Sequence, residues 1–405
     1  MPHALNTRLV HTGEHQPTAQ GYTPTALPVH ASATFYYPDL DALTGAFERG
    51  GDAVTYARHG NPSTHALETL IADVEGGRGA VVTGSGMAAL HLALLAAGTP
   101  RGNLEPAPRH ILVSNDLYGT THKQLKVFFA AQGVRVSTCD MTDLAATRQA
   151  IEAGEPDVLL CEAISNPLLK VVDLAALAEL AHAVDARLVV DATMATPVLC
   201  QPLALGVDLV VHSATKYFSG HGDALGGALA ARATLLSDTA RRYGILLGTV
   251  LSPFEAKLIM RGMKTLALRV REQCATALTL AHALGAHPQV AEVVYPGLPG
   301  HPQHALAARQ FGGLFGGILA VRLRADTRAA AAAVMSRLRI VLPATSLGDV
   351  YSLVTYPPVS SHRDVSPAER AAQGISEGLL RFSIGIEDAA DLLADLTQAL
   401  DGAAC

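Results

Sequence analysis

The chain has 405 residues, of which 49% are hydrophobic and 16% charged, and its formal net charge is −6. This length allows two or more domains with a large core. The charged fraction is low beside the roughly 25% of typical soluble domains. It indicates much buried surface, within the chain or between subunits, although simple enrichment in Ala and Leu would give the same numbers. A negative net charge disfavours nucleic-acid binding, which needs a basic face. No run approaches the roughly 18 apolar residues of a membrane span.

Cysteine usage indicates a reduced protein. The chain has five cysteines, odd in number, far apart and without a Cys-x-x-Cys pair: Cys139, Cys161, Cys200, Cys274 and Cys405. This is not a disulfide framework, and the first residues, MPHALNTRLVHTG, contain no apolar signal core. We therefore expect a cytoplasmic location. Cys161 ends an apolar run and is expected to be a buried structural thiol. We expect no metal site, because His301 and His304 flank a proline without a Cys or carboxylate cluster.

The first two thirds of the chain divide into two parts. Residues 1–60 show little hydrophobic periodicity and predict an extended N-terminal arm. From 61 to 255, short apolar runs alternate with helical stretches. The apolar runs are 80–82, 111–113, 158–160, 188–190 and 209–211, and the helical stretches include 87–97, 144–153 and 174–183. Short strands that are apolar on both faces and alternate with helices predict a mostly parallel sheet covered by helices on both sides.

The pattern changes after residue 256. A long helical segment over 255–284 leads into strand-like runs at 290–294 and 317–321. Ser366-Pro367-Ala368-Glu369 is a capping-box sequence with proline at the first helical position, and Gly374 is expected to end that helix. Residues 256–405 therefore predict a smaller α+β domain.

Polar side chains follow the apolar runs of the predicted sheet. Ligands of open parallel sheets bind beyond the carboxyl ends of the strands, so these side chains are expected to meet at one edge. They comprise glycines, hydroxyls, an amide, a carboxylate, an aromatic ring and one lysine. In chain order they are Thr83 to Met87, Ser114 to Gly119, Glu162, Ser165 to Pro167, Asp191, His212, Ser213, Thr215 and Lys216.

This set suits a phosphorylated aromatic aldehyde, pyridoxal 5′-phosphate (PLP). The glycine-rich turn at a helix N-terminus offers backbone N–H groups and a positive dipole end to a phosphate, and Ser213 and Thr215 add hydroxyl donors. Asp191 can hold a pyridine nitrogen protonated, which makes the ring an electron sink. Tyr118 can stack on the ring. Lys216 can hold the aldehyde as a Schiff base and, once released, act as a general base.

A dinucleotide site is the main alternative for the glycine-rich turn. Gly84-x-Gly86-x-x-Ala89 after a strand also fits the fingerprint of an NAD(P)-dependent oxidoreductase. That site needs an acidic residue at the end of a second strand about 20 residues later. The corresponding region, 102–109, is rich in proline, and its Glu105 lies outside any strand pattern. The oxidoreductase therefore remains only a remote alternative.

Several motifs resemble the Cys/Met-metabolism (γ-family) PLP enzymes over nearly the whole chain. The PLP-lysine region is similar in Asp191-Ala192-Thr193, in the residues from 210 to 217 and in Ser219-Gly220-His221-Gly222-Asp223. Further matches are Tyr56-Ala57-Arg58-x-x-Asn61-Pro62, Ser85-Gly86-Met87-Ala88-Ala89, Leu117-Tyr118-Gly119, Ser165-Asn166-Pro167 and the late segment from 378 to 388. The resemblance implies the type I, aspartate-aminotransferase-like PLP fold, with an arm (1–60), a large PLP domain (61–255) and a C-terminal domain (256–405).

The resemblance also implies roles for individual residues. Catalysis is assigned to Lys216, Tyr118 and Asp191. Cofactor binding is assigned to Tyr56, Arg58, Gly86, Met87, Tyr118, Asp191, Thr193, Ser213, Thr215 and Lys216, and substrate carboxylate binding to Asn166 and Arg381 with Ser346 nearby. Tyr56 and Arg58 would reach the cofactor phosphate of a neighbouring subunit, in a homotetramer built as a dimer of dimers.

Arg381 is supported by the strand pattern as well. In 380–386 the alternation places Leu380, Phe382 and Ile384 on one face and Arg381 and Ser383 on the other. Arginine is a natural bidentate partner for a carboxylate. The alternative is a solvated edge strand with a surface arginine.

Departures from the family pattern bear on the reaction. Ala192 replaces a usual Asn, 163–164 replaces Ser-Pro or Thr-Pro, Thr120 stands where methionine γ-lyases have Cys, and Thr345 stands where cystathionine enzymes have Glu or Tyr. We expect a PLP-dependent sulfur amino acid lyase, acting by β- or γ-elimination on methionine-, homocysteine- or cystathionine-like substrates. The alternative within the family is γ-replacement on an activated homoserine. The substrate is a small amino acid; no nucleic acid, membrane or metal is expected.

Overall fold

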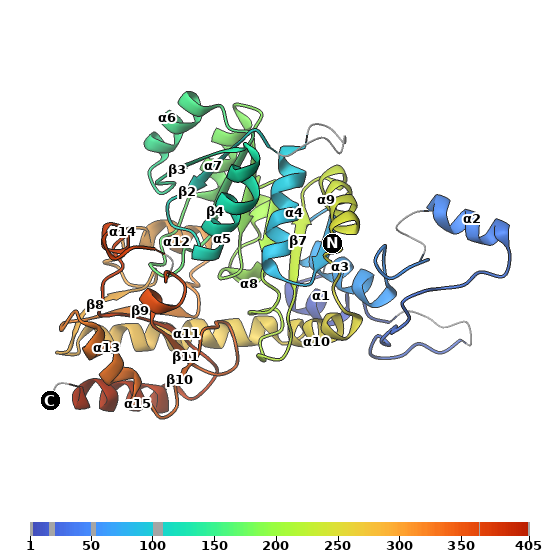
Figure 1. The fold of residues 1–405 in the computed structure, drawn as a ribbon. Helices are drawn as coiled ribbons and strands as arrows, with labels where there is room; N and C mark the ends of the chain where they lie inside the picture. The colour runs from blue at the N-terminus through green and yellow to red at the C-terminus, as the bar shows by residue number, and fades with distance from the viewer. Residues whose placement is uncertain (1–2, 16–20, 50–53, 100–107, 364, 404–405) are drawn as a thin grey trace.

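The computed structural model describes residues 3–15, 21–49, 54–99, 108–363 and 365–403 (Figure 1). Two sheets organise this part of the chain, one of seven strands and one of five. The first lies among helices in the upper part of the view, and the second lies at the lower left. Cys405 and Glu105, both considered above, fall outside the described residues.

The seven-stranded sheet confirms the predicted mostly parallel arrangement. Its strands are β1 (Gly79–Thr83), β2 (His110–Ser114), β3 (Arg135–Cys139), β4 (Val158–Glu162), β5 (Arg187–Asp191), β6 (Leu209–His212) and β7 (Gly227–Ala231). Their order is β1-β7-β6-β5-β4-β2-β3, and only β7 runs antiparallel to its neighbours. The sequence patterns missed β3, because it is partly polar, and β7, because the small residues of GALAA carry a weak strand preference.

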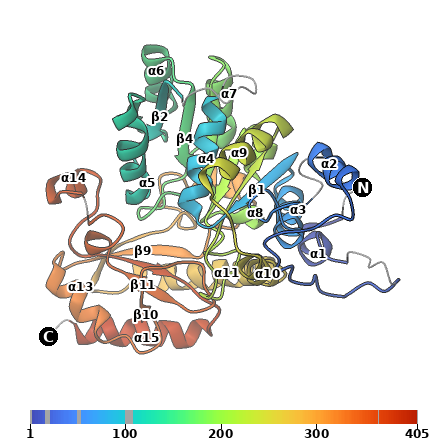
Figure 2. The ribbon, with the colours of Figure 1, turned by 45° about the vertical axis from the view of Figure 1, so that its right-hand side comes forward.

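Helices cover both faces of this sheet (Figures 1 and 2). Strand alternation decides which side chain meets which layer. In β5, Val189 belongs to the apolar cluster that contains side chains of α4 (Gly86–Gly98) and α9 (Thr234–Leu247), whereas Leu188 and Val190 belong to the cluster that contains side chains of α3 (Pro62–Glu75) and α7 (Leu174–His182). The other helices of this part are α5 (Gly119–Gln124), α6 (Leu144–Gly154) and α8 (Thr196–Leu199), and shorter turns lie at Leu125–Phe129, Ala130–Gln132 and Pro202–Leu205.

The predicted long helix is two helices, α10 (Pro253–Met263) and α11 (Leu266–Gly285). The chain leaves the helical conformation at Thr265, which has φ −108° and ψ 4°. Beside this break, Gly262 packs directly on the backbone of Phe218 and Ser219, where a Cβ would meet the Ser219 carbonyl oxygen at 2.0 Å. A tertiary contact at this point is not encoded in helical periodicity, so the sequence predicted an uninterrupted helix.

The five-stranded sheet has the order β10-β11-β12-β9-β8. Its strands are β8 (Val290–Val294), β9 (Ile318–Leu323), β10 (Leu342–Pro343), β11 (Leu353–Thr355) and β12 (Leu379–Ser383). The helices of this part are α12 (His304–Gln310), α13 (Arg328–Met335), α14 (Pro367–Ala372) and α15 (Ala389–Gly402), with a short turn at Pro357–Val359. Side chains of α11, α13 and α15 form its apolar core.

The capping box predicted before α14 is confirmed. Ser366 Oγ accepts the N–H of Glu369 at 3.3 Å, and Glu369 Oε2 accepts the N–H of Ser366 at 3.0 Å. The α14 helix ends at Ala372, and Gly374 follows with φ +83°, a conformation that favours glycine.

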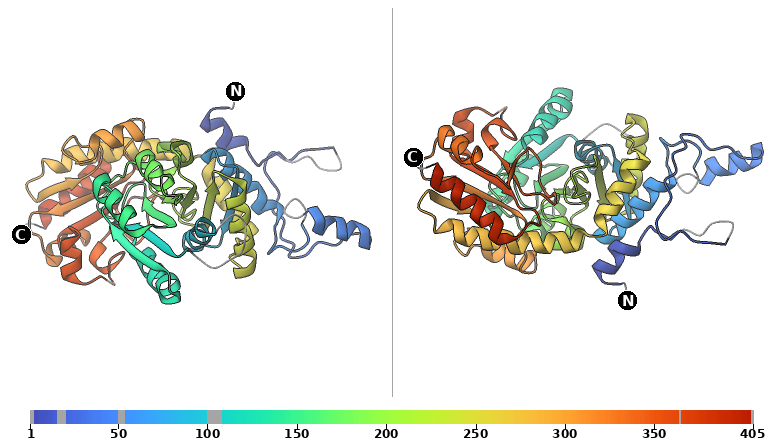
Figure 3. Two further views of the ribbon diagram at one scale, coloured as in Figure 1. Left: turned by 90° about the horizontal axis from the view of Figure 1, so that it is seen from above. Right: turned by 90° about the horizontal axis from the view of Figure 1, so that it is seen from below.

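The sequence predicted an extended N-terminal arm, and this prediction is wrong in part. The described residues of the arm contain two helices, α1 (Leu5–His11) and α2 (Leu40–Arg49). Figures 1 and 3 show α2 standing away from the body of the molecule. Exposed apolar side chains occur along this part, including Tyr36, Leu40 and Phe47, which are 96%, 75% and 61% exposed. A short amphipathic helix interrupted by polar loops gives too few turns for its periodicity to stand out.

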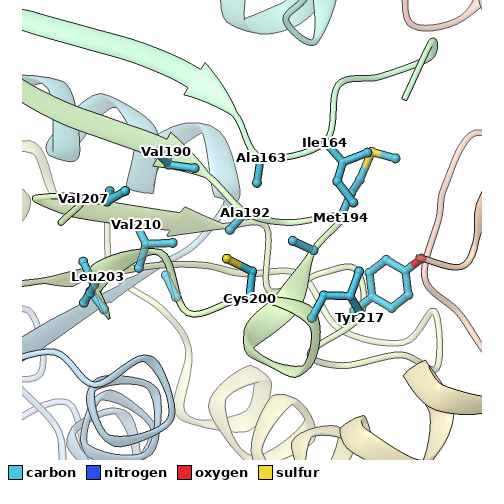
Figure 4. Close-up of a cluster of buried hydrophobic side chains, with 14 of the residues drawn as sticks. Ala163, Ile164, Val190, Ala192, Met194, Cys200, Leu203, Val207, Val210 and Tyr217 are labelled. Carbon is cyan, nitrogen blue, oxygen red and sulfur yellow. The ribbon is translucent and has the colours of Figure 1, made fainter. Parts of the chain in front are cut away.

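An apolar cluster lies on the α3 and α7 side of the sheet and extends from Leu203 and Val207, before β6, to the carboxyl ends of β4 and β5 (Figure 4). It contains three of the residues that depart from the family pattern, Ala163, Ile164 and Ala192, and all three are buried. The four described cysteines are free and buried. Burial raises the pKa of Cys161, as predicted for a structural thiol.

None of the helices in the described residues has the length and apolar character needed to cross a bilayer.

Candidate active site

A cavity of about 590 Å³ lies where the carboxyl edge of the first sheet meets the second sheet. Eleven of the residues predicted from the sequence line it: Gly86, Met87, Tyr118, Asn166, Asp191, Thr193, Ser213, Thr215, Lys216, Ser346 and Arg381. Segments from residue 85 to residue 381 therefore meet around one space. Tyr56 and Arg58 do not line it.

The glycine turn before α4 forms a tight cradle. Ser85 caps the helix by accepting the N–H of Ala88 at 3.2 Å. A Cβ on Gly86 would lie 2.8 Å from the Ser213 Cβ and 3.1 Å from its Oγ, so no larger residue fits without a shift. The N–H groups of Gly86 and Met87 are in the first helical turn, where no intrahelical carbonyl is available. Close packing, free donors and the helix dipole together fit a bound phosphate.

Asp191 is held at the end of β5 by a hydrogen-bond chain. Its Oδ1 accepts the N–H of Thr193 at 2.9 Å, and Thr193 Oγ1 accepts the N–H of Ser213 at 2.8 Å. Thr193 therefore links the carboxylate to the loop that carries Lys216. Burial raises the pKa of Asp191, while the Thr193 hydrogen bonds and nearby His212 lower it. A cationic ring nitrogen at this carboxylate would offset the cost of burying its charge.

Glu162 is a site residue that the sequence did not assign a role. It ends β4 directly opposite Asp191 in the strand register. Its carboxylate accepts the N–H of Tyr118 at 2.6 Å and of Asn166 at 3.1 Å, so it positions both residues. Burial and the neighbouring Asp191 raise the pKa of Glu162 well above its ordinary value. Its place at a strand end, matching that of Asp191, was the available signal.

Lys216 projects into the cavity from the loop after β6. Its Nζ donates to Ser346 Oγ at 3.1 Å. Burial lowers the pKa of Lys216, Asp349 raises it and Arg381 lowers it. A buried amine with a lowered pKa loses its proton more readily, and only the neutral form is a nucleophile or base.

Arg381 is a buried cation on β12, which lies between β11 and β9. The alternative of a solvated edge strand is therefore wrong. Its Nη1 donates to Asn166 Oδ1 at 2.8 Å, and its Nη2 donates to the Ser346 carbonyl at 2.9 Å and to Thr355 Oγ1 at 3.2 Å. Burial lowers the pKa of Arg381 to about 10.

Within the described residues, no carboxylate forms an ion pair with Arg381, and its Nε has no hydrogen-bond partner. A buried guanidinium with only neutral partners can accept a substrate carboxylate. Thr355, which faces Arg381 across the β11–β12 register, was missed because no local motif marks it.

Three of the departures from the family pattern, Thr120, Ile164 and Thr345, line the cavity. All three are uncharged, and the two threonines are short. The loop after β11 also contributes lining residues that the sequence did not single out: Val359, Ser360, Ser361, Arg363 and Val365.

Tyr56 and Arg58 lie together outside the cavity. Arg58 Nη1 donates to the Ile245 carbonyl at 2.9 Å, and its guanidinium lies 5.5 Å from the centroid of the Tyr56 ring. The structure therefore does not bring these two residues into the cavity of their own chain.

Comparison with known proteins gives a family match. Residues 6–401 match the model of the family described as Cys/Met metabolism PLP-dependent enzyme. The chain is 40% identical over 394 residues to cystathionine gamma-synthase of Mycobacterium tuberculosis (strain ATCC 25618 / H37Rv), covering 97% of this chain and 96% of that protein. It is also 40% identical over 401 residues to L-methionine gamma-lyase of Pseudomonas deceptionensis, covering 98% and 97% of the two chains.

A solved structure gives the same result. The crystal structure of cystathionine gamma synthase from Xanthomonas oryzae pv. oryzae, in complex with aminoacrylate and cysteine, superposes with a TM-score of 0.91. The sequences are 37% identical, and the match covers 100% of this chain and 99% of that one.

The cradle at Gly86 generates a direct test. Gly86→Ala adds a methyl group against Ser213, so the turn must shift and move its N–H donors away from the phosphate. If the cost of overpacking, about 1–3 kcal/mol, is taken from the binding of PLP, the affinity falls roughly five- to 150-fold. Equilibrium dialysis of the apo-protein against PLP measures it. Gly285→Ala is the control, because a Cβ there meets nothing within 4 Å. Equal PLP affinity in the two variants would contradict the role of the Gly86 turn in binding the cofactor phosphate.

Proposed function

The chain belongs to the Cys/Met metabolism family of PLP-dependent enzymes, and from this premise we propose that it is a lyase of sulfur amino acids. It would act by β- or γ-elimination on methionine-, homocysteine- or cystathionine-like substrates. The family match excludes the NAD(P)-dependent oxidoreductase. The structure agrees with this exclusion. The next strand after the glycine turn, β2, ends in Ser114, whereas a dinucleotide-binding site needs an acidic residue at the end of its second strand.

The cavity residues divide into cofactor and substrate groups. Backbone N–H groups of Gly86 and Met87, with the hydroxyls of Ser213 and Thr215, would hold the phosphate of PLP. Asp191, supported by Thr193, would hold the ring nitrogen, and Tyr118 would cover the ring. When bound, PLP supplies an electron-withdrawing ring that stabilises negative charge on the substrate.

The remaining residues would hold the substrate and move its protons. Arg381 and Asn166, which share a hydrogen bond of 2.8 Å, would bind the α-carboxylate and fix the α-carbon near Lys216. The lowered pKa of Lys216 favours the neutral amine, which can take the α-proton and return it to a neighbouring atom. Ser346, bonded to Lys216 at 3.1 Å, would aim the amine.

The uncharged side chain of Thr345 is the observation that supports a choice among substrates. It lines the cavity beside Ser346 and has no charge. By resemblance, cystathionine γ-lyases and γ-synthases carry a glutamate here, which can engage the distal amino group of the substrate. We therefore propose that substrates with one amino acid head are preferred. Equal identity of 40% to a cystathionine gamma-synthase and to a methionine gamma-lyase keeps γ-replacement on an activated homoserine as the second candidate.

Assembly is proposed from the position of Tyr56 and Arg58. They lie outside the cavity of their own chain, and the arm that carries them exposes Tyr36, Leu40 and Phe47. We propose a homotetramer, a dimer of dimers, in which these two residues complete a neighbour's site. We also propose a cytoplasmic location, on the basis of the free described cysteines.

A division into an arm (1–60), a PLP domain (61–255) and a C-terminal domain (256–405) is likewise proposed. Every strand of the first sheet lies between Gly79 and Ala231, and every strand of the second lies between Val290 and Ser383. The two sheets share no strand.

Product analysis tests the reaction and the role of Thr345 together. Methionine, homocysteine, cystathionine and O-acetylhomoserine would each be supplied with and without a thiol. Elimination releases the sulfur or oxygen substituent and, with water, ammonia and a 2-oxo acid, whereas replacement exchanges that substituent for the added thiol. Thr345→Glu should raise kcat/KM for cystathionine relative to methionine by roughly ten- to over a hundredfold, because a charge-assisted contact is worth about 1.5–3 kcal/mol.

Thr345→Gln is the matched control, since it adds similar length without charge. A wild-type enzyme that prefers cystathionine, with no gain in Thr345→Glu, would contradict the assignment of substrate. Release of a 2-oxo acid only as a minor product beside the thiol adduct would instead favour the replacement enzyme.

Shared active sites predict complementation between two inactive chains. Arg58→Ala should lose cofactor phosphate binding in the neighbour, and Lys216→Ala should lose catalysis in its own site. Mixed oligomers would contain sites with Arg58 from one chain and Lys216 from the other, so activity should return to about a quarter of wild type if chains pair at random. Activity would be measured after unfolding and refolding equal amounts of the two variants together. Mixtures that stay inactive would refute the sharing of sites.

A further inference from the structure

Asp349 is a buried carboxylate that the proposed chemistry leaves without a role. It is 4% exposed and lies three residues after Ser346, whose hydroxyl accepts a hydrogen bond from Lys216 at 3.1 Å. Its Oδ1 has no hydrogen-bond partner. Burying a carboxylate is costly unless a cation or donors compensate for it, so a charged side chain here needs a reason.

The turn from Ser346 to Asp349 is built to hold this carboxylate beside the Lys216 loop. Gly348 has φ +78°, and a Cβ on it would lie 2.8 Å from the Tyr217 ring and backbone, so only glycine fits. Gln273 Nε2 donates to the Asp349 carbonyl at 2.9 Å, and the N–H of Val350 donates to the Gly220 carbonyl at 2.9 Å. The contacts of Gly348 with Tyr217 and of Val350 with Gly220 therefore fix the two loops to each other on both sides of Asp349, and α11 holds the Asp349 backbone through Gln273.

Cations flank the Asp349 carboxylate. Among the described residues, the charged groups that shift the pKa of Lys216 are Asp349 and Arg381, and the charged groups that shift the pKa of Asp349 are Lys216 and Arg269. Arg269 is itself buried, and its Nη1 has no hydrogen-bond partner. Burial raises the pKa of Asp349, whereas Lys216, the Ser346 hydroxyl, the N–H of Gly222 and Arg269 lower it. Asp349 thus shares one turn with Ser346, the residue that hydrogen-bonds Lys216, and lies within electrostatic reach of the amine.

We propose that Asp349 is a positioning residue for Lys216, which orients the amine through the Ser346 hydroxyl and acts as its counter-charge. This inference rests on the proposed role of Lys216 in holding PLP. Without a counter-charge, burial and Arg381 would both drive the proton off the amine. Asp349 opposes them and keeps the amine able to carry a proton between the steps in which it receives and returns one.

The sign of the effect fixes the test. Apo-protein captures PLP when the neutral Lys216 amine adds to the aldehyde and one water leaves. The capture rate therefore rises with pH as Lys216 loses its proton. Removing a nearby negative charge makes that loss easier, so Asp349→Asn and Asp349→Ala should move the midpoint of the capture profile to lower pH, by about one unit. At a pH below the wild-type midpoint, capture should be about tenfold faster.

The measurement follows the growth of the visible absorbance of the Lys216–PLP linkage by stopped flow, between about pH 6 and pH 10. Circular dichroism and thermal unfolding check that each variant is folded. Asp395→Asn is the matched control, because Asp395 is also 4% exposed and accepts N–H groups from Arg339, Ile340 and Val341, far from Lys216 in the sequence. It should lower stability and leave the midpoint unchanged.

The outcomes separate this inference from the proposed function. Wild-type protein that captures no PLP on Lys216 would overturn both. Capture with the same midpoint in wild type, Asp349→Asn and Asp349→Ala would overturn the role of Asp349 alone. The same holds if Asp349→Asn changes only the kcat/KM for cystathionine, because Asp349 would then contact the distal amino group of the substrate. A downward shift in both Asp349 variants and none in Asp395→Asn supports the proposal.

Discussion

The parallel pairing of β4, β5 and β6 is the constraint on which the site depends. It brings Glu162, Asp191 and the loop with Lys216 to one edge of the sheet, and it places two carboxylates opposite each other, Glu162 buried and Asp191 partly buried. Like charges in a low-dielectric region raise each other's pKa unless cations or donors compensate. The chain supplies donors to both, from Tyr118 and Thr193 among others. The family's cofactor is a phosphorylated pyridine, and its protonated ring nitrogen would form an ion pair with Asp191.

The sequence predicted the strand ends well, because alternation of apolar runs and helices fixes which edge of a parallel sheet receives the polar residues. Asp191, Ser213 and Lys216 follow from this rule alone. Tertiary contacts were not predictable: Glu162 acquires its role only through Tyr118 and Asn166, and the break at Thr265 depends on a contact of Gly262 with another loop. The helices of the arm were missed because they are short.

The departures from the family pattern lie in two places. Ala163 and Ala192 lie in the buried apolar cluster on one face of the sheet, so they concern packing, whereas Ile164 belongs to that cluster and also lines the cavity. Thr120 and Thr345 line the cavity, so they concern the substrate. The residues shared with the family therefore specify the fold and the cofactor, whereas the departures that line the cavity affect which sulfur amino acid is bound.

The central claim is that Lys216 holds PLP, and reduction with borohydride followed by mass spectrometry tests it most directly. Purified protein with PLP should show a visible absorbance band that borohydride bleaches. The reduced pyridoxyl group should then be found on the peptide that contains Lys216, at one group per chain. No visible band after addition of PLP, or a modification on another lysine in place of Lys216, would contradict the account.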